Sequence, residues 1–182
     1  MNVVLIDTMA VRIGQRLLLA AQEAITSGDF EIGAVLLYSA VEASLSIGIG
    51  ELTVWRATQE RDLALTEDEI ERKVRGLGSV RKKLEVFQQL AGTTLKDEAL
   101  RLREMGEIPS KHLLAFVRLE TEFQALASER HRFIHQGKEV DPEIIRLQAE
   151  TVAKFVFLLD SMWHSTFDLS RPPLNPPGKP GK

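Results

Sequence analysis

Residues 30–47 read FEIGAVLLYSAVEASLSI, and this stretch decides the fold class of the chain. Its apolar residues cover almost the whole circumference of an α-helix, which is typical of a helix at the centre of a domain. Amphipathic helical patterns lie on both sides of it along the chain, without a convincing strand alternation. The sequence therefore predicts an all-α domain, built as an up-and-down bundle of four to six helices.

The other predicted helices are placed by their apolar spacing and by start and stop signals. Thr66 and Glu69 form a capping box, and Asp141 is an N-cap followed by a proline at the first helical position. Gly76 and Gly78 predict a bend or a break in the helix that follows Thr66. The predicted helices span about 8–27, 30–47, 66–90, 95–105, 109–135 and 142–167, with an irregular connection over 48–65 that contains Trp55.

The composition limits the classes of protein and of chemistry that are open to the chain. Its 182 residues and 44% hydrophobic content suffice for one domain, which we expect over residues 1–168. The absence of cysteine excludes disulfides, thiolate nucleophiles and cysteine-ligated metal centres. A net charge of −3 argues against binding duplex DNA by overall charge, so any nucleic-acid contact must be local. The proline- and glycine-rich residues 169–182 predict a disordered or polyproline-like tail.

The location predicted from the sequence is cytoplasmic. The longest apolar stretch, from Ile32 to Val41, is much shorter than the ~20 residues of a membrane-spanning helix. The first seven residues lack the basic region of a signal peptide. We therefore expect no association with a membrane.

The candidate functional residues lie near the end of the helix predicted over 109–135, in the string RHRFIH at positions 130–135. The Arg130 guanidinium is a permanently charged, bidentate clamp for phosphate oxygens. The His135 imidazole gains or loses a proton near neutral pH. Facing one phosphodiester, the two side chains have the groups that transesterification of RNA requires without a metal.

Arg130 lies on the apolar stripe of its helix, three residues after Ala127 and four before Ile134. A buried arginine needs a partner, because an unpaired buried charge is costly. One interpretation is structural, with a carboxylate such as Glu120 or Glu122 as that partner. The other is functional, with Arg130 in a polar seam between two subunits.

The five-residue spacing of Arg130 and His135 places their side chains roughly 140° apart on an ideal helix. Either the helix ends near His135, since Gly137 follows, or the two-fold axis of a homodimer brings two copies of the string together. His131 and His135 have the i, i+4 spacing of metal ligands, but Arg132 occupies the place of the glutamate in a zinc-protease helix. We therefore expect no metal and no cofactor at this site.

Other polar residues have structural explanations. The basic residues between Arg72 and Lys83 alternate with glutamates, which favours a solvated helix face over an RNA-binding surface. Glu42 lies in the apolar helix and is interpreted as a hydrogen-bonded carboxylate rather than a general acid. His112 and His164 are isolated, and we expect them on helix surfaces or in packing roles.

The string Arg130-His131-x-x-x-His135, late in a helix and shortly before a glycine, resembles the signature of the HEPN superfamily. The helical pair at the front of the chain, joined near residues 28–30, adds to a resemblance that extends over residues 8–167. It implies a HEPN-like helical bundle that forms a homodimer with a composite site between the subunits. Many members of the superfamily are metal-independent endoribonucleases of toxin–antitoxin, abortive-infection and other defence systems.

Carried over to this chain, the resemblance implies that Arg130 binds the scissile phosphate and stabilises its charge, and that His135 is the acid and base. His131 fills the polar position that supports them. RNA is then the substrate, attacked by its own 2′-OH, and an antitoxin protein is a further expected partner. Some members carry a regulatory tyrosine two residues after the histidine, where this chain has Gly137, so that form of regulation is unsupported.

Two alternatives belong to other classes of protein. One is a non-catalytic HEPN-like module that binds RNA, a nucleotide or a partner protein. The other is a purely structural helical bundle. The complete pair of Arg130 and His135 favours the enzyme, whereas the acidic charge balance favours the alternatives.

Overall fold

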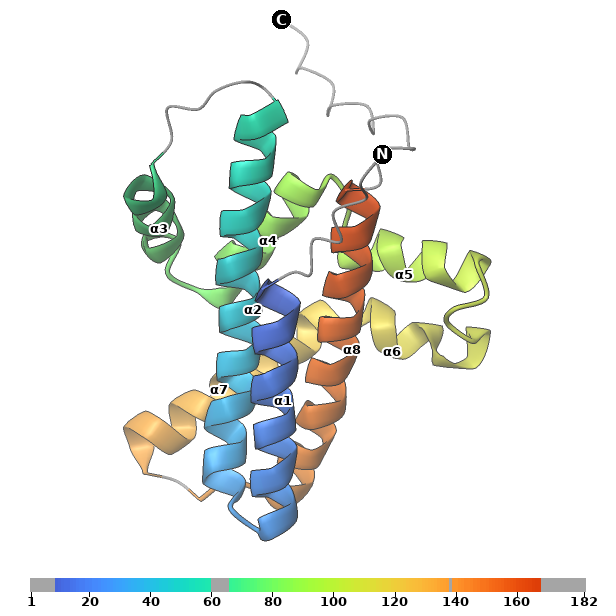
Figure 1. The fold of residues 1–182 in the computed structure, drawn as a ribbon. Coiled ribbons are helices and arrows are strands. Elements are labelled where there is room, and N and C mark those ends of the chain that lie inside the picture. The colour runs from blue at the N-terminus through green and yellow to red at the C-terminus, as the bar shows by residue number, and fades with distance from the viewer. Residues whose placement is uncertain (1–8, 60–65, 138, 168–182) are drawn as a thin grey trace, which may run out of the picture.

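The computed structural model describes residues 9–59, 66–137 and 139–167, and these contain helices and no strand. The all-α class predicted from the sequence is therefore confirmed. Three long helices form a first layer in which they lie side by side (Figure 1): α1 (Met9–Ser27), α2 (Phe30–Gln59) and α8 (Pro142–Phe167). The tail predicted over 169–182 lies outside the described residues.

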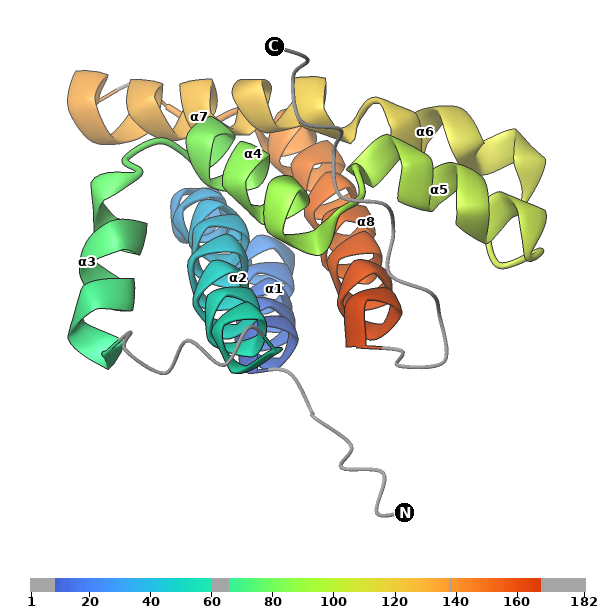
Figure 2. The ribbon, with the colours of Figure 1, turned by 90° about the horizontal axis from the view of Figure 1, so that it is seen from above.

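A second layer crosses the first. It contains α4 (Val80–Ala91) and α7 (Leu119–Gln136), which run across the long helices (Figure 2). The up-and-down order is limited to α1 and α2, which are antiparallel, because α8 runs in the same direction as α2 (Figure 1). Shorter helices flank the two layers: α3 (Glu67–Gly76), α5 (Leu95–Glu104), a 3-10 turn η1 (Ser110–His112) and α6 (Leu113–Val117).

The first two helices form a closely packed antiparallel pair, because glycine occurs where they touch. A Cβ atom at Gly14 of α1 would overlap the Oγ atom of Ser44 on α2. A Cβ atom at Gly33 of α2 would lie 2.6 Å from Cγ1 of Ile25 on α1. At these two positions only glycine leaves room for the facing side chain.

The centre of the domain is α2, as its sequence predicts. Leu37, Ala40, Leu45 and Leu52 are completely buried. By length and composition alone, α2 is also the one described helix that is long and apolar enough to cross a membrane. Half of its most apolar 18-residue stretch is buried inside the domain. The core helix of a soluble protein also meets these criteria of length and composition.

The extent of α2 differs from the prediction, because the helix continues to Gln59 where an irregular connection was expected. Gly48 and Gly50 each disfavour a helix by about 1 kcal/mol relative to alanine. Ile49 and Leu52 are nevertheless buried, and burial of such a side chain contributes roughly 1.5–3 kcal/mol. Tertiary packing therefore outweighs the local preference, and Trp55 lies on the helix.

The remaining helices begin where predicted but are more numerous. Thr66 and Glu69 form the capping box, and the Asp141 carboxylate accepts hydrogen bonds from the backbone N–H groups of residues 143 and 144. The break predicted at the two glycines separates α3 from α4. A second break at Arg118, whose ψ of −1° is not that of an α-helix, separates α6 from α7. The described residues therefore contain eight α-helices, where four to six were predicted.

Candidate functional site

The string at positions 130–135 lies in the last turns of α7, at the end that projects past α2 (Figure 1). The helix continues to Gln136 and ends there because Gly137 adopts the left-handed conformation, with a φ of 60°. Glycine takes this conformation without strain, and it is the usual residue after the end of a helix. Arg130, His131 and His135 are therefore all presented by regular helix.

Arg130 is half-buried and turned toward α2. The central carbon of its guanidinium lies 4.3 Å from the centre of the Tyr38 ring. Such a cation–π contact stabilises by about 0.5–1 kcal/mol at an exposed site and by more where water is excluded. The contact holds the guanidinium over the ring, and the planar group carries its N–H donors in a fixed fork.

The partner that the structure shows for Arg130 is the Tyr38 ring, where the sequence analysis considered a carboxylate. Glu122 instead accepts a hydrogen bond of 2.7 Å from Oγ1 of Thr151 on α8. The side chain of Glu120 lies outside the described residues. Among the described side chains, the crossing of α7 over α2 brings an aromatic ring against the guanidinium, and the pairing with a carboxylate stays a prediction.

Tyr38 is a neutral platform for Arg130. Burial raises the pKa of its phenol, the negative charge of Glu42 raises it further, and the positive charge of Arg130 acts in the opposite direction. The net effect moves the pKa further above neutral pH, so the phenol keeps its proton. The ring thus holds the arginine without adding a competing negative charge.

A small cleft of about 150 Å³ opens beside Tyr38, between α2, α4 and α7. Phe123 and Ala127 of α7 contribute to its lining, as do Ser79 and Arg81 at the start of α4. Ala127 lies one turn before Arg130 on the same side of the helix. The cleft and the stacked pair of Tyr38 and Arg130 therefore belong to one continuous surface.

Near this surface, a half-buried ion pair joins α4 to α2. The Nζ atom of Lys83, whose side chain is 8% exposed, donates to Oε1 of Glu42 at 2.9 Å. Glu42 is thus hydrogen-bonded, as interpreted from the sequence. The prediction that all basic residues between Arg72 and Lys83 lie on a solvated face is wrong for Lys83. This residue lies on the same side of α4 as the buried Val80 and Phe87.

The other cations of that run agree with the prediction. Arg75 pairs with Glu71, and both Arg81 and Lys82 pair with Glu85, in each case between exposed side chains. Exposed pairs of this kind contribute about 0–1 kcal/mol each. They form a solvated face on α3 and α4.

The two histidines of the string contact each other. The ring centres of His131 and His135 lie 4.7 Å apart, and both residues are exposed. Across the described part of the chain, no group of three or more histidine, aspartate or glutamate side chains gathers in a way that could hold a metal ion. Arg130 and His135 remain on different sides of α7, about 140° apart by their spacing, so the fold does not bring these two together within one chain.

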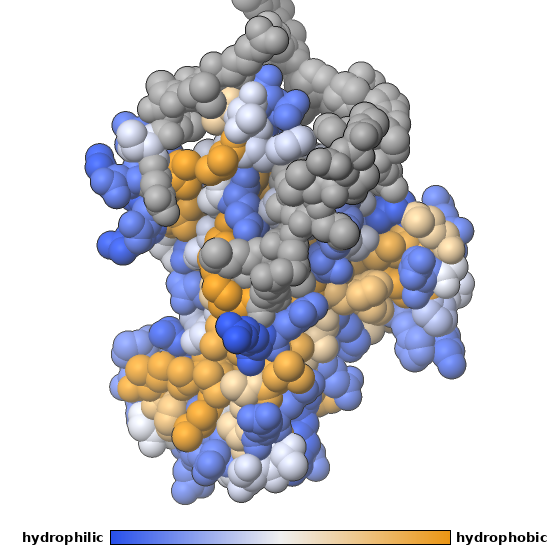
Figure 3. Space-filling view, viewed as in Figure 1, coloured by the Kyte–Doolittle hydropathy of each residue, from blue (hydrophilic) through white to orange (hydrophobic). Residues whose placement is uncertain are grey.

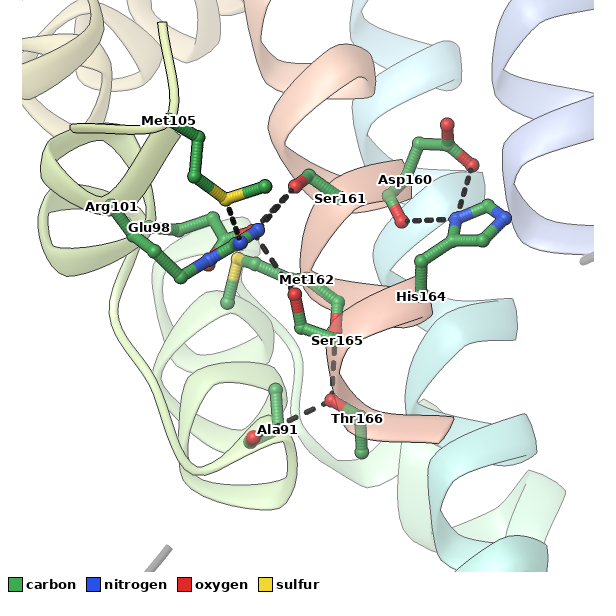
Figure 4. A network of polar contacts seen from close by, with 10 residues as sticks. All are labelled: Ala91, Glu98, Arg101, Met105, Asp160, Ser161, Met162, His164, Ser165 and Thr166. Carbon is green, nitrogen blue, oxygen red and sulfur yellow. Dashed lines mark hydrogen bonds and ion pairs between the residues drawn. The ribbon is translucent and has the colours of Figure 1, made fainter. Parts of the chain in front are cut away.

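The sequence analysis missed a second polar cluster, which joins α5 to α8 (Figure 4). Glu98 on α5 is 2% exposed, and Arg101 donates to its two carboxylate oxygens at 2.8 and 2.5 Å. Ser161 on α8 donates to Oε1 of Glu98 at 2.5 Å and accepts a hydrogen bond of 3.0 Å from Arg101. We call these three side chains the Glu98 network.

The Glu98 carboxylate remains charged in this buried position. Burial raises its pKa, but the hydrogen bonds from Arg101 and Ser161 and the charge of Arg101 outweigh burial, and the net pKa is lowered. The sequence held one signal, since Glu98 lies between Leu95 and Leu102 on an apolar stripe. Because its groups are bonded to one another, the network serves to attach α5 to α8.

The two isolated histidines lie on helix surfaces, as expected. His164 is exposed on α8, where its Nδ1 atom lies 3.3 Å from Oδ1 of Asp160 one turn earlier (Figure 4). His112 is exposed at the end of η1. No contact among the described residues joins either histidine to the string on α7.

Comparisons with known proteins identify no relative of this chain. No protein-family model matches it, and no curated protein or solved structure matches it significantly. A function for the chain must therefore be argued from the site at the end of α7 and from the resemblance of its residues to the HEPN signature.

Proposed function

We propose that this chain is a metal-independent endoribonuclease of the HEPN type, which acts as a homodimer in the cytoplasm. The observation that carries the proposal is the stacking of Arg130 on Tyr38 at the helix end that also presents two exposed histidines. The stacking supports a guanidinium whose position is set before the substrate binds. Donors fixed in advance around developing charge are an effective means of stabilising a transition state.

In the proposed reaction, the 2′-oxygen of one RNA nucleotide attacks the adjacent phosphorus atom while His135 takes its proton. The bond from phosphorus to the 5′-oxygen of the next nucleotide breaks, and His135 gives the proton that it took to the leaving oxygen. The products are a 2′,3′-cyclic phosphate and a 5′-hydroxyl end. Arg130 binds the non-bridging oxygens, where negative charge increases, and His131 supports His135 from 4.7 Å away.

The proposed site is shared between two subunits. Because Arg130 and His135 point about 140° apart on α7, a single chain does not hold both on one phosphate. A two-fold axis at the ends of two α7 helices places Arg130 of one copy opposite His135 of the other. Ile134 lies between the two residues in sequence and is 42% exposed, so it offers apolar surface for this contact.

The biological setting of the proposal comes from the resemblance. It is a toxin–antitoxin, defence or stress system, in which an antitoxin protein is the partner and RNA is the substrate. The net charge of −3 is compatible with this setting if RNA contacts only the local cations Arg130, Arg132 and Arg81.

The alternative is a non-catalytic HEPN-like module that binds RNA, a nucleotide or a protein. The stacking of Arg130 on Tyr38 favours it in one respect, because the contact also explains Arg130 as a purely structural residue. The two proposals differ in a single measurable property, which is turnover of RNA.

Incubation of the pure protein with labelled RNA tests the proposal. Cleavage should persist in EDTA and leave a 2′,3′-cyclic phosphate, and DNA should resist because it lacks the 2′-OH. His135→Ala should slow cleavage by about 10²–10⁴-fold, since it removes the proton-transfer group. Arg130→Ala should slow it on the order of 10²–10³-fold, and Arg130→Lys should also impair it, because a point charge lacks the bidentate fork.

Two matched controls accompany these variants. Arg146 also stacks on a ring, at 5.2 Å from the centre of Phe30, and His112 is an exposed histidine outside the string. Arg146→Ala and His112→Ala should cleave RNA at the rate of the wild type. If the variants of the string behave like these controls, or if the wild type cleaves no RNA offered, the binding module replaces the enzyme.

A further inference from the structure

A groove of about 850 Å³ lies between α3 and the C-terminal part of α2. Its walls are mainly apolar and include Val54 and Trp55 of α2, Val74 of α3 and Trp163 of α8. Figure 3 shows apolar surface exposed between α3 and the upper part of α2. The chain has two tryptophans, and both of them line this groove.

The groove exists because α1 is shorter than the helix on which it packs. Gly14 of α1 faces Ser44 of α2, and the two helices run in opposite directions (Figure 1). Since both helices rise equally per residue, Met9 at the start of α1 lies about level with Ile49 of α2. The groove residues Val54, Trp55 and Thr58 lie beyond that level.

The face of α2 that α1 covers continues into the groove. Residues seven and eleven positions after Ser44 lie on the same side of the helix as Ser44. These residues are Glu51 and Trp55, and both line the groove. The groove is therefore the extension of the α1–α2 interface past Met9.

We infer that this groove is the docking site of residues 1–8 of the same chain, which directly precede α1. Four of the eight residues, from Val3 to Ile6, form an apolar run that suits the apolar walls. Eight residues reach at most about 28 Å when extended and about 12 Å as a helix. The part of α2 from Gly50 to Thr58 is about 12 Å long, so the segment is long enough in either conformation.

A tethered segment also has an advantage over any free occupant. Because it is joined to α1, which already packs on the same face of α2, its effective concentration at the groove is on the order of millimolar. A free apolar ligand or a second copy of the chain must in addition lose translational freedom on binding. The continuity of the interface and the tether therefore both favour residues 1–8.

A single fluorophore tests the docking, because the chain has no cysteine and an introduced one is a unique labelling site. Bimane attached to Asn2→Cys is quenched when it contacts a tryptophan. We expect quenching that is relieved by Trp55→Phe and does not change with protein concentration. Bimane on Ser27→Cys, at the other end of α1, should be insensitive to Trp55→Phe. Circular dichroism of each labelled protein checks that the helices are retained.

If the emission of the Asn2 label does not rise in a folded Trp55→Phe protein, the inference is overturned. Quenching that is lost on dilution would overturn it too, because a second copy would then fill the groove. Tryptophan emission provides an independent measurement in the full chain. Val4→Asp combined with Leu5→Asp should shift the emission to longer wavelength, whereas Asn2→Asp, which lies outside the apolar run, should not. An unchanged emission in the double variant would contradict the docking.

Discussion

At the contact between α5 and α8, the Glu98 carboxylate is 2% exposed and accepts hydrogen bonds from Arg101 and Ser161, whereas at the end of α7 both His131 and His135 are exposed. In the first region Glu98 and Arg101 are paired with each other, and removal of Arg101 would leave the buried Glu98 carboxylate without its counter-charge. In the second region the two imidazoles contact each other and are open to solvent. Polar residues of similar chemistry therefore stabilise the fold in one place and remain available for binding in the other.

Arg130 stands between these two cases. It is half-buried like a structural residue, but the face of a tyrosine ring holds it in place of a carboxylate. A ring does not neutralise the positive charge, so the guanidinium keeps its attraction for an anion. Arg101, by contrast, is bound to the Glu98 carboxylate through two of its nitrogens.

The largest loss of stability should follow from breaking the Glu98 network. Glu98→Gln removes the counter-charge of Arg101 and should lower the free energy of unfolding by about 2–4 kcal/mol, which is less than the loss of a partner costs in a fully buried ion pair because the Arg101 side chain is 27% exposed. Urea denaturation measures this change. The matched control is Glu85→Gln, which breaks only exposed pairs and should cost less than about 1 kcal/mol. Equal losses in the two variants would contradict the contrast between the regions.

The same network should make the protein sensitive to acid. The pKa of Glu98 is lowered in the folded state from the ordinary value of 4.5, so its contribution is complete above about pH 4.5. It is lost as the pH falls through the lowered value, because the unfolded chain then binds a proton more readily than the folded one. Urea denaturation at a series of pH values should show this loss in the wild type, and a smaller loss in Glu98→Gln. Identical pH profiles would exclude Glu98 as its source.

A smaller loss of stability is expected from breaking the contact between Arg130 and the Tyr38 ring. Tyr38→Leu should lower the free energy of unfolding by about 0.5–1 kcal/mol for the lost stacking, and should slow RNA cleavage because Arg130 loses its fixed position. Tyr38→Phe keeps the ring and should change both quantities less. Denaturation and cleavage assays on the two variants make the comparison. Full activity of Tyr38→Leu would show that stacking does not position the arginine.

The smallest effect on stability is expected at the histidines. His131→Ala and His135→Ala should each change the free energy of unfolding by less than about 0.5 kcal/mol, because both side chains are exposed. Thermal or urea denaturation checks this expectation. A loss as large as that of Glu98→Gln would assign the string on α7 to structure instead of chemistry.

Local signals in the sequence were sufficient wherever a few neighbouring residues determine the geometry. The capping box of Thr66 and Glu69 and the cap at Asp141 predicted helix starts that the structure confirms. Gly137 likewise predicted the end of the helix that bears the string. Each of these signals acts within one helical turn, which explains why the sequence alone reveals them.

Features that depend on packing between distant segments could not be predicted in this way. The continuation of α2 past Gly48 and Gly50 follows from burial of Ile49 and Leu52 against other helices. Ser161 lies far along the chain from Glu98, and no spacing rule joins them. Tyr38 meets Arg130 only because α7 crosses α2, and neither the crossing nor its register is encoded in a local pattern.

The central claim is that two subunits share each site, with Arg130 from one copy and His135 from the other. It is tested most directly by mixing Arg130→Ala and His135→Ala proteins after their subunits have been allowed to exchange, and then measuring RNA cleavage. Random pairing makes half of the dimers mixed, and each mixed dimer contains one site in which both residues are intact. We therefore expect the mixture to recover about a quarter of the wild-type activity. A mixture as inactive as the two separate variants would contradict it.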